Sequence, residues 1–143
     1  MKIAEAITTG ARLPGIYRLN SRAKPSVLLG DVAKAGWRTF YIDGHQIFDK
    51  ASFLKTFADT LAFPNYFGNN WDAFEECIRD LAPAPGYVLL YDQVSQFALK
   101  EPDDWEIALD ILAAAVSFWN KTDSPLYIFL RNAGDFARQV QVW

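Results

Sequence analysis

The chain has 143 residues, of which 51% are hydrophobic, 15% aromatic and 22% charged. This composition is that of a folded protein and excludes a disordered or fibrous chain, and the length suits one domain. The formal net charge of −3 argues against a nucleic-acid-binding protein, because such proteins usually carry a basic face.

Cysteine content and apolar runs place the chain in a reducing compartment. Cys77 is the only cysteine, so neither an internal disulfide nor a cysteine-based metal cluster can form. Residues 1–5 lack a signal-peptide apolar run, and no stretch reaches the roughly 20 apolar residues of a membrane helix. We therefore expect a cytoplasmic protein without a membrane segment. Glycine-rich phosphate loops and metal-ligand spacings are also absent, so we predict no cofactor and no metal site.

Short β-branched and aromatic runs predict strands, and apolar residues at helical spacing predict helices between them. In chain order we predict a strand at 15–19, a helix at 26–35, a strand at 38–42, a helix opened by Asp49 and stopped by Pro64, a helix at 70–81, a strand at 87–91, a helix at 103–120 and a strand at 126–130. This alternation predicts an α/β fold with a small three- to four-stranded parallel sheet packed with helices. We expect residues 1–143 to form one domain.

Residues 71–81 divide into an apolar and a charged arc when placed on a helix. The charged arc carries a local net charge of −3 and consists of Asp72, Glu75, Glu76, Arg79 and Asp80. Such an arc is equally typical of the solvated face of an ordinary amphipathic helix. It indicates a binding surface only together with the residues that precede it.

The loop before this helix has the composition of a binding site. Gly68 permits backbone conformations that other residues resist, and Asn69 or Asn70 can cap the helix. Of the adjacent aromatics Tyr66 and Phe67, we expect one ring to pack inward and the other to stay at the surface. An exposed tyrosine beside an acidic helix is typical of a binding hot spot, because the ring anchors a partner that the charges steer.

The segment Pro64-Asn65-Tyr66-Phe67-Gly68-Asn69-Asn70-Trp71-Asp72-Ala73 resembles the signature Pro-x-Tyr-(Tyr/Phe)-Gly-x-Asn-x-Asp-Ala of the barstar family. Members are small bacterial proteins that inhibit secreted ribonucleases by plugging the active site. The strand ending in Asp43-Gly44 and the pair Glu76-Cys77 also agree with the family pattern. The resemblance implies a barstar-like fold with a family core over residues 36–131 and an N-terminal extension over residues 1–35.

The resemblance also implies a role for each matching residue. Tyr66 would stack against the substrate pocket of the partner, and Asn70 would be a polar contact at the helix start. Asp72 and Glu76 would enter the site where a ribonuclease expects phosphates. Carboxylates on a preformed helix mimic those phosphates without offering a bond to cleave, and opposite charges speed the encounter.

The second half of the helix departs from the family pattern. Glu75 stands where the family prototype has a large aromatic, and Glu76 is one methylene longer than the usual aspartate. Arg79 and Asp80 replace small or hydroxyl residues, and Leu81 replaces the closing aromatic. Because Glu75, Arg79 and Asp80 share the charged arc, we include them in the predicted partner-binding surface. These departures leave the identity of the partner open.

We interpret the chain as an inhibitor or immunity protein, not an enzyme, that acts as a monomer on a secreted-type basic ribonuclease or related nuclease toxin. One alternative is a non-inhibitory protein-interaction module on the same fold, favoured by the changes at Glu75, Arg79 and Leu81. Another is a hydrolase that uses the clustered carboxylates, which would require one of them to be buried.

Other residues with chemical potential have simpler structural interpretations. His45, the only histidine, lies in a predicted turn, where we expect it to be solvated. Cys77 falls on the apolar arc and is expected to pack there. Trp105 and Trp119 lie on nearly the same face of one helix and are expected in the core.

Overall fold

The computed structural model describes residues 2–64 and 68–143. Those residues include one four-stranded sheet, in which all pairs are parallel and the strand order is β1-β4-β3-β2. The strands are β1 (Ile16–Arg18), β2 (Arg38–Asp43), β3 (Tyr87–Asp92) and β4 (Leu126–Leu130). The predicted α/β class, parallel sheet and four strands are therefore confirmed, with the first strand shorter than expected.

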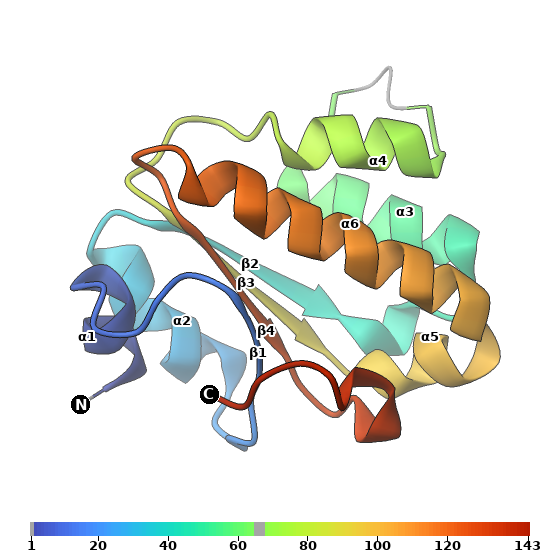
Figure 1. Ribbon diagram of the computed structural model, residues 1–143, viewed down its shortest axis with the longest axis horizontal. Coiled ribbons are helices and arrows are strands. Elements are labelled where there is room, and N and C mark those ends of the chain that lie inside the picture. Colours follow the sequence, from blue (N-terminus) through green and yellow to red (C-terminus); the bar gives the residue numbers. More distant parts are fainter. Residues whose placement is uncertain (1, 65–67) are drawn as a thin grey trace.

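Helices cover both faces of the sheet (Figure 1). Helices α3, α4 and α6 lie over one face, and α1 and α2 lie over the other. The helical segments are α1 (Ile3–Thr8), α2 (Pro25–Lys34), η1 (Gly44–Gln46), α3 (Lys50–Leu61), α4 (Trp71–Ile78), α5 (Val94–Lys100), α6 (Pro102–Asn120) and η2 (Gly134–Ala137). Within residues 2–64 and 68–143, no helix combines the length and apolar character needed to cross a membrane.

The central strands are buried on both faces, which explains their nearly continuous apolar sequences. Alternate side chains of β3 supply two separate cores. Tyr87, Leu89 and Tyr91 face the larger core under α3 to α6, where Trp105 and Trp119 are also buried as predicted. Val88 and Leu90 face the smaller core under α1 and α2.

Local chemistry sets the start of the long helices. Asp49 caps α3 by accepting a hydrogen bond from the Ser52 N–H (2.8 Å), and the Ser52 hydroxyl accepts one from the Asp49 N–H (3.1 Å). This reciprocal capping lowers the pKa of Asp49, mainly through the backbone hydrogen bond from Ser52. Pro25 and Pro102 occupy the first positions of α2 and α6, where a missing N–H costs no helical hydrogen bond.

The helix predicted at 70–81 is shorter than expected, because α4 ends at Ile78. The Trp119 indole N–H of α6 donates to the Ile78 carbonyl oxygen (2.9 Å), which a longer helix would use for its own ladder. The backbone N–H groups of Arg79 and Asp80 instead donate to the carbonyl oxygens of Glu76 and Cys77, which forms tight turns. This end fixes α4 against α6.

Several short segments were not predicted. Helix α1 has six residues and α5 has seven, which is too short for a clear apolar period. Pro102 separates α5 from α6, since a proline cannot continue the backbone ladder of the helix before it. His45 lies in η1 and is exposed, as expected, with Nδ1 2.9 Å from the Asp43 carboxylate.

The N-terminal residues complete the edge of the sheet. Strand β1 pairs with β4, so that Ile16 lies opposite Ile128 and Arg18 opposite Leu130. The last residues of the chain run outside β1, where Arg18 and Val142 form an isolated parallel bridge. Backbone groups at this edge therefore have partners.

Candidate functional site

The candidate site is built on α4, whose start is fixed by Asn70. Its side-chain oxygen accepts a hydrogen bond from the Ala73 N–H (2.8 Å), and its amide nitrogen donates to the Gly68 carbonyl (3.3 Å). One side chain therefore caps the helix and ties it to the preceding loop. Tyr66, the predicted aromatic anchor, lies outside the described residues.

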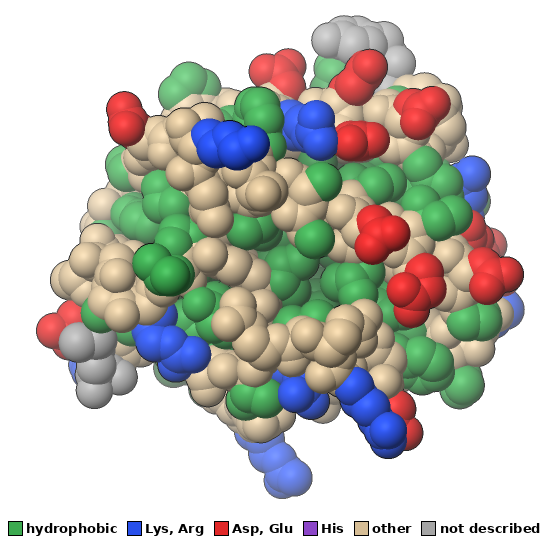
Figure 2. Space-filling model, in the orientation of Figure 1, with side chains coloured by type: hydrophobic (Ala, Val, Ile, Leu, Met, Phe, Trp, Pro, Cys, Tyr) green, Lys and Arg blue, Asp and Glu red, His purple; other side chains and the backbone are tan. Residues whose placement is uncertain are grey.

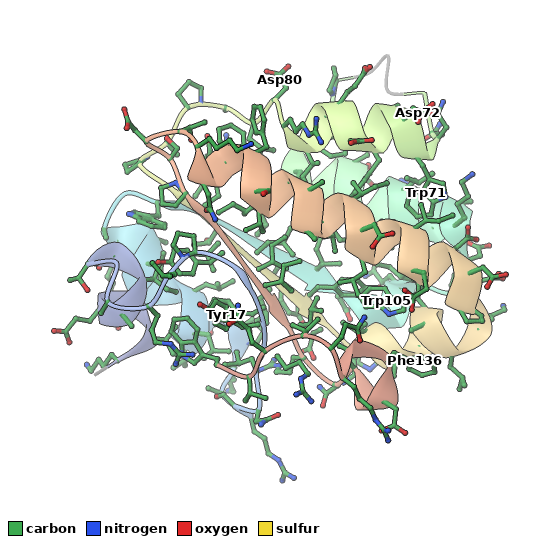
Figure 3. The ribbon with its side chains drawn as sticks, viewed as in Figure 1. Tyr17, Trp71, Asp72, Asp80, Trp105 and Phe136 are labelled. Atoms are coloured by element: carbon green, nitrogen blue, oxygen red, sulfur yellow. The ribbon has the colours of Figure 1, made fainter. Side chains whose placement is uncertain are left out.

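Three carboxylates form an exposed row on α4 and the turn after it. Asp72 and Glu76 are four residues apart and follow one another along one face of α4, and Asp80 lies in the turn that ends the helix. All three are exposed, and Asp72 and Asp80 point away from the sheet near opposite ends of α4 (Figure 3). Asp72 also lies in the first helical turn, where a negative charge is favourable. The structure thus brings three of the predicted surface residues into one acidic row.

Glu75 and Arg79 form a separate pair beside this row. Arg79 Nη2 lies 2.8 Å from Glu75 Oε1, and both side chains are only 37–40% exposed. The Arg79 guanidinium also lies 5.7 Å from the ring of Phe118 on α6. Since the two charges cancel, the outward negative charge of the surface comes from Asp72, Glu76 and Asp80.

Phe118 belongs to the same surface, although helical spacing did not predict its exposure there. Its side chain is 38% exposed, and it packs edge-on against Trp119 with ring centroids 5.3 Å apart. Arg79 Nε is buried and has no hydrogen-bond partner in the described part of the chain. An exposed aromatic ring next to an arginine is a typical binding feature.

The inner side of α4 is held rigidly by aromatic packing. Phe74 and Trp71 both contact Phe53 of α3, with ring centroids 5.4 Å apart in each pair. Trp71 lies on the side of α4 that faces α3 (Figure 3), and Lys50 Nζ is 5.6 Å from its ring. Cys77 is half-buried, and burial together with the nearby Glu76 and Asp80 raises the pKa of its thiol. The acidic row therefore stands on a preformed support.

The surface offers charge rather than an enclosed reaction centre. Figure 2 shows acidic side chains gathered over α4 and the neighbouring part of α6, and several basic ones along the lower edge of that view. No group of three or more His, Cys, Asp or Glu residues outside positions 1 and 65–67 could hold a metal ion. A row of exposed carboxylates can attract and bind cationic groups, whereas acid–base catalysis by paired carboxylates relies on one of them being buried.

Comparisons with known proteins give a family and a fold. The family model described as Barstar (barnase inhibitor) matches residues 37–131. No curated protein matches the chain. A Walker-type ATPase of Pyrococcus abyssi superposes with a TM-score of 0.59 at 11% identity, covering 92% of this chain and 44% of the ATPase. The Aeropyrum pernix ORC2 protein superposes with a TM-score of 0.58 at 10% identity, covering 96% of this chain and 42% of ORC2.

At these identities the likeness to the two solved structures shows the fold alone. The chain spans less than half the length of either. In this chain the segment that follows β1, residues 19–24, reads Leu-Asn-Ser-Arg-Ala-Lys and contains no glycine-rich phosphate loop.

Proposed function

The chain belongs to the barstar family, and from this we propose that it inhibits a basic ribonuclease or related nuclease toxin by covering the active site with α4 and the loop before it. The family match supports binding to a ribonuclease at a general level. The proposal adds the surface that makes the contact and the chemistry of recognition. It assigns a binding role rather than a catalytic one.

The exposed row Asp72, Glu76 and Asp80 is the observation that carries this proposal. A ribonuclease site binds a polyanion, so it presents positively charged side chains at phosphate spacing. Carboxylates on a capped helix offer the same charge without a phosphodiester bond. Because Asn70 and the aromatic support hold α4 before binding, little ordering is needed when the partner arrives.

The Glu75–Arg79 pair removes an electrostatic objection to this role. An unpaired arginine on the surface would repel a basic partner. Here the Arg79 guanidinium is hydrogen-bonded to Glu75 and lies against Phe118, so the pair presents little net charge. The attraction at long range then comes from the acidic row and depends on salt concentration.

The test measures inhibition of a panel of small basic ribonucleases by the full chain at low and at physiological salt. We expect at least one enzyme to be inhibited, more strongly at low salt. Glu76→Gln should weaken binding by about tenfold or more, because it removes one charge from the contact while keeping the side-chain shape.

Glu106→Gln is the matched control, since Glu106 is an exposed acid on α6 outside the proposed surface. This control should change affinity by less than about twofold, as expected for a charge outside the contact. Equal effects of the two variants would assign the binding to overall charge rather than to α4. Failure to inhibit any ribonuclease at low salt would overturn the proposal.

A second candidate function rests on Phe118 and Arg79. Aromatic and arginine side chains dominate the energetics of many protein interfaces, so this pair could anchor a partner that is not a nuclease. Binding of that kind would survive Glu76→Gln and would be lost in Phe118→Ala. The two variants together therefore separate a charge-driven inhibitor from an interaction module.

The proposal also includes the setting in which the protein works. We propose that residues 1–143, with a family core at 36–131 and an N-terminal extension at 1–35, form one domain that acts as a monomer in a bacterial cytoplasm. Light scattering on the purified chain should give a mass near the 16.2 kDa of one chain. A mass of twice that value would contradict the monomer.

A further inference from the structure

A polar cavity of about 770 Å³ lies far from the family signature, at the carboxyl ends of three strands. It is lined by residues 18–22 at the end of β1, residues 92–93 at the end of β3 and residues 130–134 at the end of β4. The segments that follow the neighbouring strands β1 and β4 pack on opposite faces of the sheet. Helix α2 follows β1 on the face of the smaller core, whereas η2 follows β4 and packs on α5. Ligands of open α/β sheets bind in crevices at such positions.

The charges around the cavity favour an anion. Arg18, Arg22 and Arg131 line it together with one carboxylate, that of Asp92. The three guanidinium groups and one carboxylate leave a local charge of +2 in a chain whose net charge is −3. The cavity is therefore a site of positive charge in an acidic protein.

Asp92 is fully engaged and does not oppose an anion strongly. Its Oδ2 accepts a hydrogen bond from Arg131 Nη2 (2.6 Å), and its Oδ1 accepts from Asn132 Nδ2 (2.8 Å) and from the Gln93 N–H (2.9 Å). Burial disfavours the charged carboxylate, but these hydrogen bonds outweigh it and hold the pKa of Asp92 below its usual value. Its charge is thus paired with Arg131.

Arg131 gives the cavity a rigid cationic wall. It is only 8% exposed, and its Nη1 donates to the carbonyl oxygens of Ala23 (2.7 Å) and Ser21 (3.2 Å). These contacts hold the loop after β1 against the end of β4. Its Nε is buried and lacks a hydrogen-bond partner among residues 2–64 and 68–143. Since this nitrogen is not accessible and the terminal nitrogens are already bonded, Arg131 contributes its positive charge to the cavity wall rather than a free donor.

The other two arginines retain donors that an anion could use. Arg18 is half-buried, and Nε donates to the Val140 carbonyl oxygen (2.7 Å), which orients the guanidinium and leaves its terminal nitrogens for other acceptors. Arg22 is exposed. Planar guanidinium groups match the oxygen spacing of phosphates and carboxylates.

The backbone at the strand ends is also unusual. Gln93 follows β3 with φ 52° and Asn132 follows β4 with φ 55°, so two neighbouring non-glycine residues adopt the left-handed conformation in the wall of one cavity. Such strained residues cluster at ligand sites.

We propose that the cavity binds a small anion that carries phosphate or carboxylate groups. The volume fits a ligand of metabolite size. Because the loop at residues 19–24 lacks glycines, the anion would be held by arginine side chains rather than by a loop of backbone N–H groups. The site shares no residue with the α4 surface and is independent of the function proposed above.

The test is calorimetric titration of the full chain with pyrophosphate, ADP and citrate at low salt. We expect saturable binding of at least one probe, with one site per chain. The probes separate the sources, since preference for ADP would indicate a nucleotide, for pyrophosphate a simple oligophosphate, and for citrate a carboxylate metabolite. Arg22→Glu should weaken binding by about tenfold or more, because it reverses an exposed charge at the site without disturbing packing.

Lys34→Glu is the matched control, since Lys34 is exposed at the far end of α2 and makes the same change in net charge. It should bind the probe as the unaltered chain does. The proposal is overturned if no probe gives saturable binding, if Arg22→Glu binds normally, or if both variants lose binding equally. Glu76→Gln should leave the titration unchanged, so this result and the ribonuclease test can fail separately.

Discussion

Trp119 joins the end of α4 to α6, and Trp119→Phe tests whether this link sets the length of the helix. The indole N–H donates to the Ile78 carbonyl oxygen (2.9 Å), and the ring packs on Tyr87 with centroids 4.8 Å apart. The residue is 9% exposed. Phenylalanine keeps an aromatic ring in this space but has no donor.

Two losses add up in this variant. Leaving the buried Ile78 carbonyl without its partner costs about 1–3 kcal/mol. The smaller ring gives up roughly 40 Å² of buried surface, or about 1 kcal/mol at ~25 cal/mol per Å². We therefore expect the free energy of unfolding to fall by about 2–4 kcal/mol.

Urea unfolding followed by far-ultraviolet circular dichroism measures this change without depending on the replaced tryptophan. With an m-value of about 2 kcal/mol per M, the midpoint should fall by about 1–2 M. Trp37→Phe is the matched control, because Trp37 is partly buried and its indole has no hydrogen bond to any other described residue. It should lose only the ring contribution, about 1 kcal/mol.

Hydrogen exchange gives a local measurement of the same link. The N–H groups of Arg79 and Asp80 close the turns that end α4. Their exchange should accelerate in Trp119→Phe, while that of β3 should change only as global stability does. If the two tryptophan variants lose equal stability and exchange at residues 79–80 is unaltered, the hydrogen bond does not determine where α4 ends.

Two further predictions concern polar groups at the end of β3. The Tyr91 hydroxyl is buried without a hydrogen-bond partner in residues 2–64 and 68–143, and burial raises its pKa. Removing this unpaired polar group in Tyr91→Phe should stabilise the protein by about 1 kcal/mol. Calorimetry should show Tm raised by about 2–4 °C. A lower Tm would show that the hydroxyl has a partner. Asp92→Asn should cost about 3 kcal/mol near neutral pH because it leaves the buried Arg131 unpaired. Folding lowers the pKa of Asp92, so its contribution is complete above its unfolded pKa of about 3.9 and is lost as the pH falls through the lower folded pKa. The stability difference between the two proteins should therefore begin to narrow below about pH 4 and close only below the folded pKa. A gap that is constant with pH would contradict this.

Much of the fold could be predicted from local sequence because the signals are local. The buried strands β3 and β4 are short continuous apolar runs, and Asp49 and Pro102 mark helix starts through their own backbone chemistry. The end of α4 could not be predicted in this way. It depends on a hydrogen bond between Ile78 and Trp119, two residues 41 positions apart.

The candidate site likewise has parts that local sequence predicts and parts that depend on long-range contacts. Asn70 as helix cap and the exposed positions of Asp72 and Glu76 follow from helical spacing and the loop before it. Glu75 and Arg79 are four residues apart, which permits an ion pair, but the contact with Phe118 depends on how α4 and α6 cross. The arginine cavity is easier to recognise in the sequence. Asp92, Arg131 and Asn132 directly follow predicted strands, and the ends of parallel strands bring such polar side chains together.

The two surfaces have opposite charges, and this affects how a basic partner would approach. The acidic row on α4 attracts such a partner, whereas the arginines at the ends of β1 and β4 repel it, so the molecule presents α4 preferentially during a long-range encounter. An anion bound in the cavity would neutralise the repelling end and increase the net negative charge of the chain. The bound anion should therefore change the association rate constant of the partner. This change should be small at physiological salt, where the screening length is about 8 Å. It should vanish in Arg22→Glu if the anion acts through this cavity.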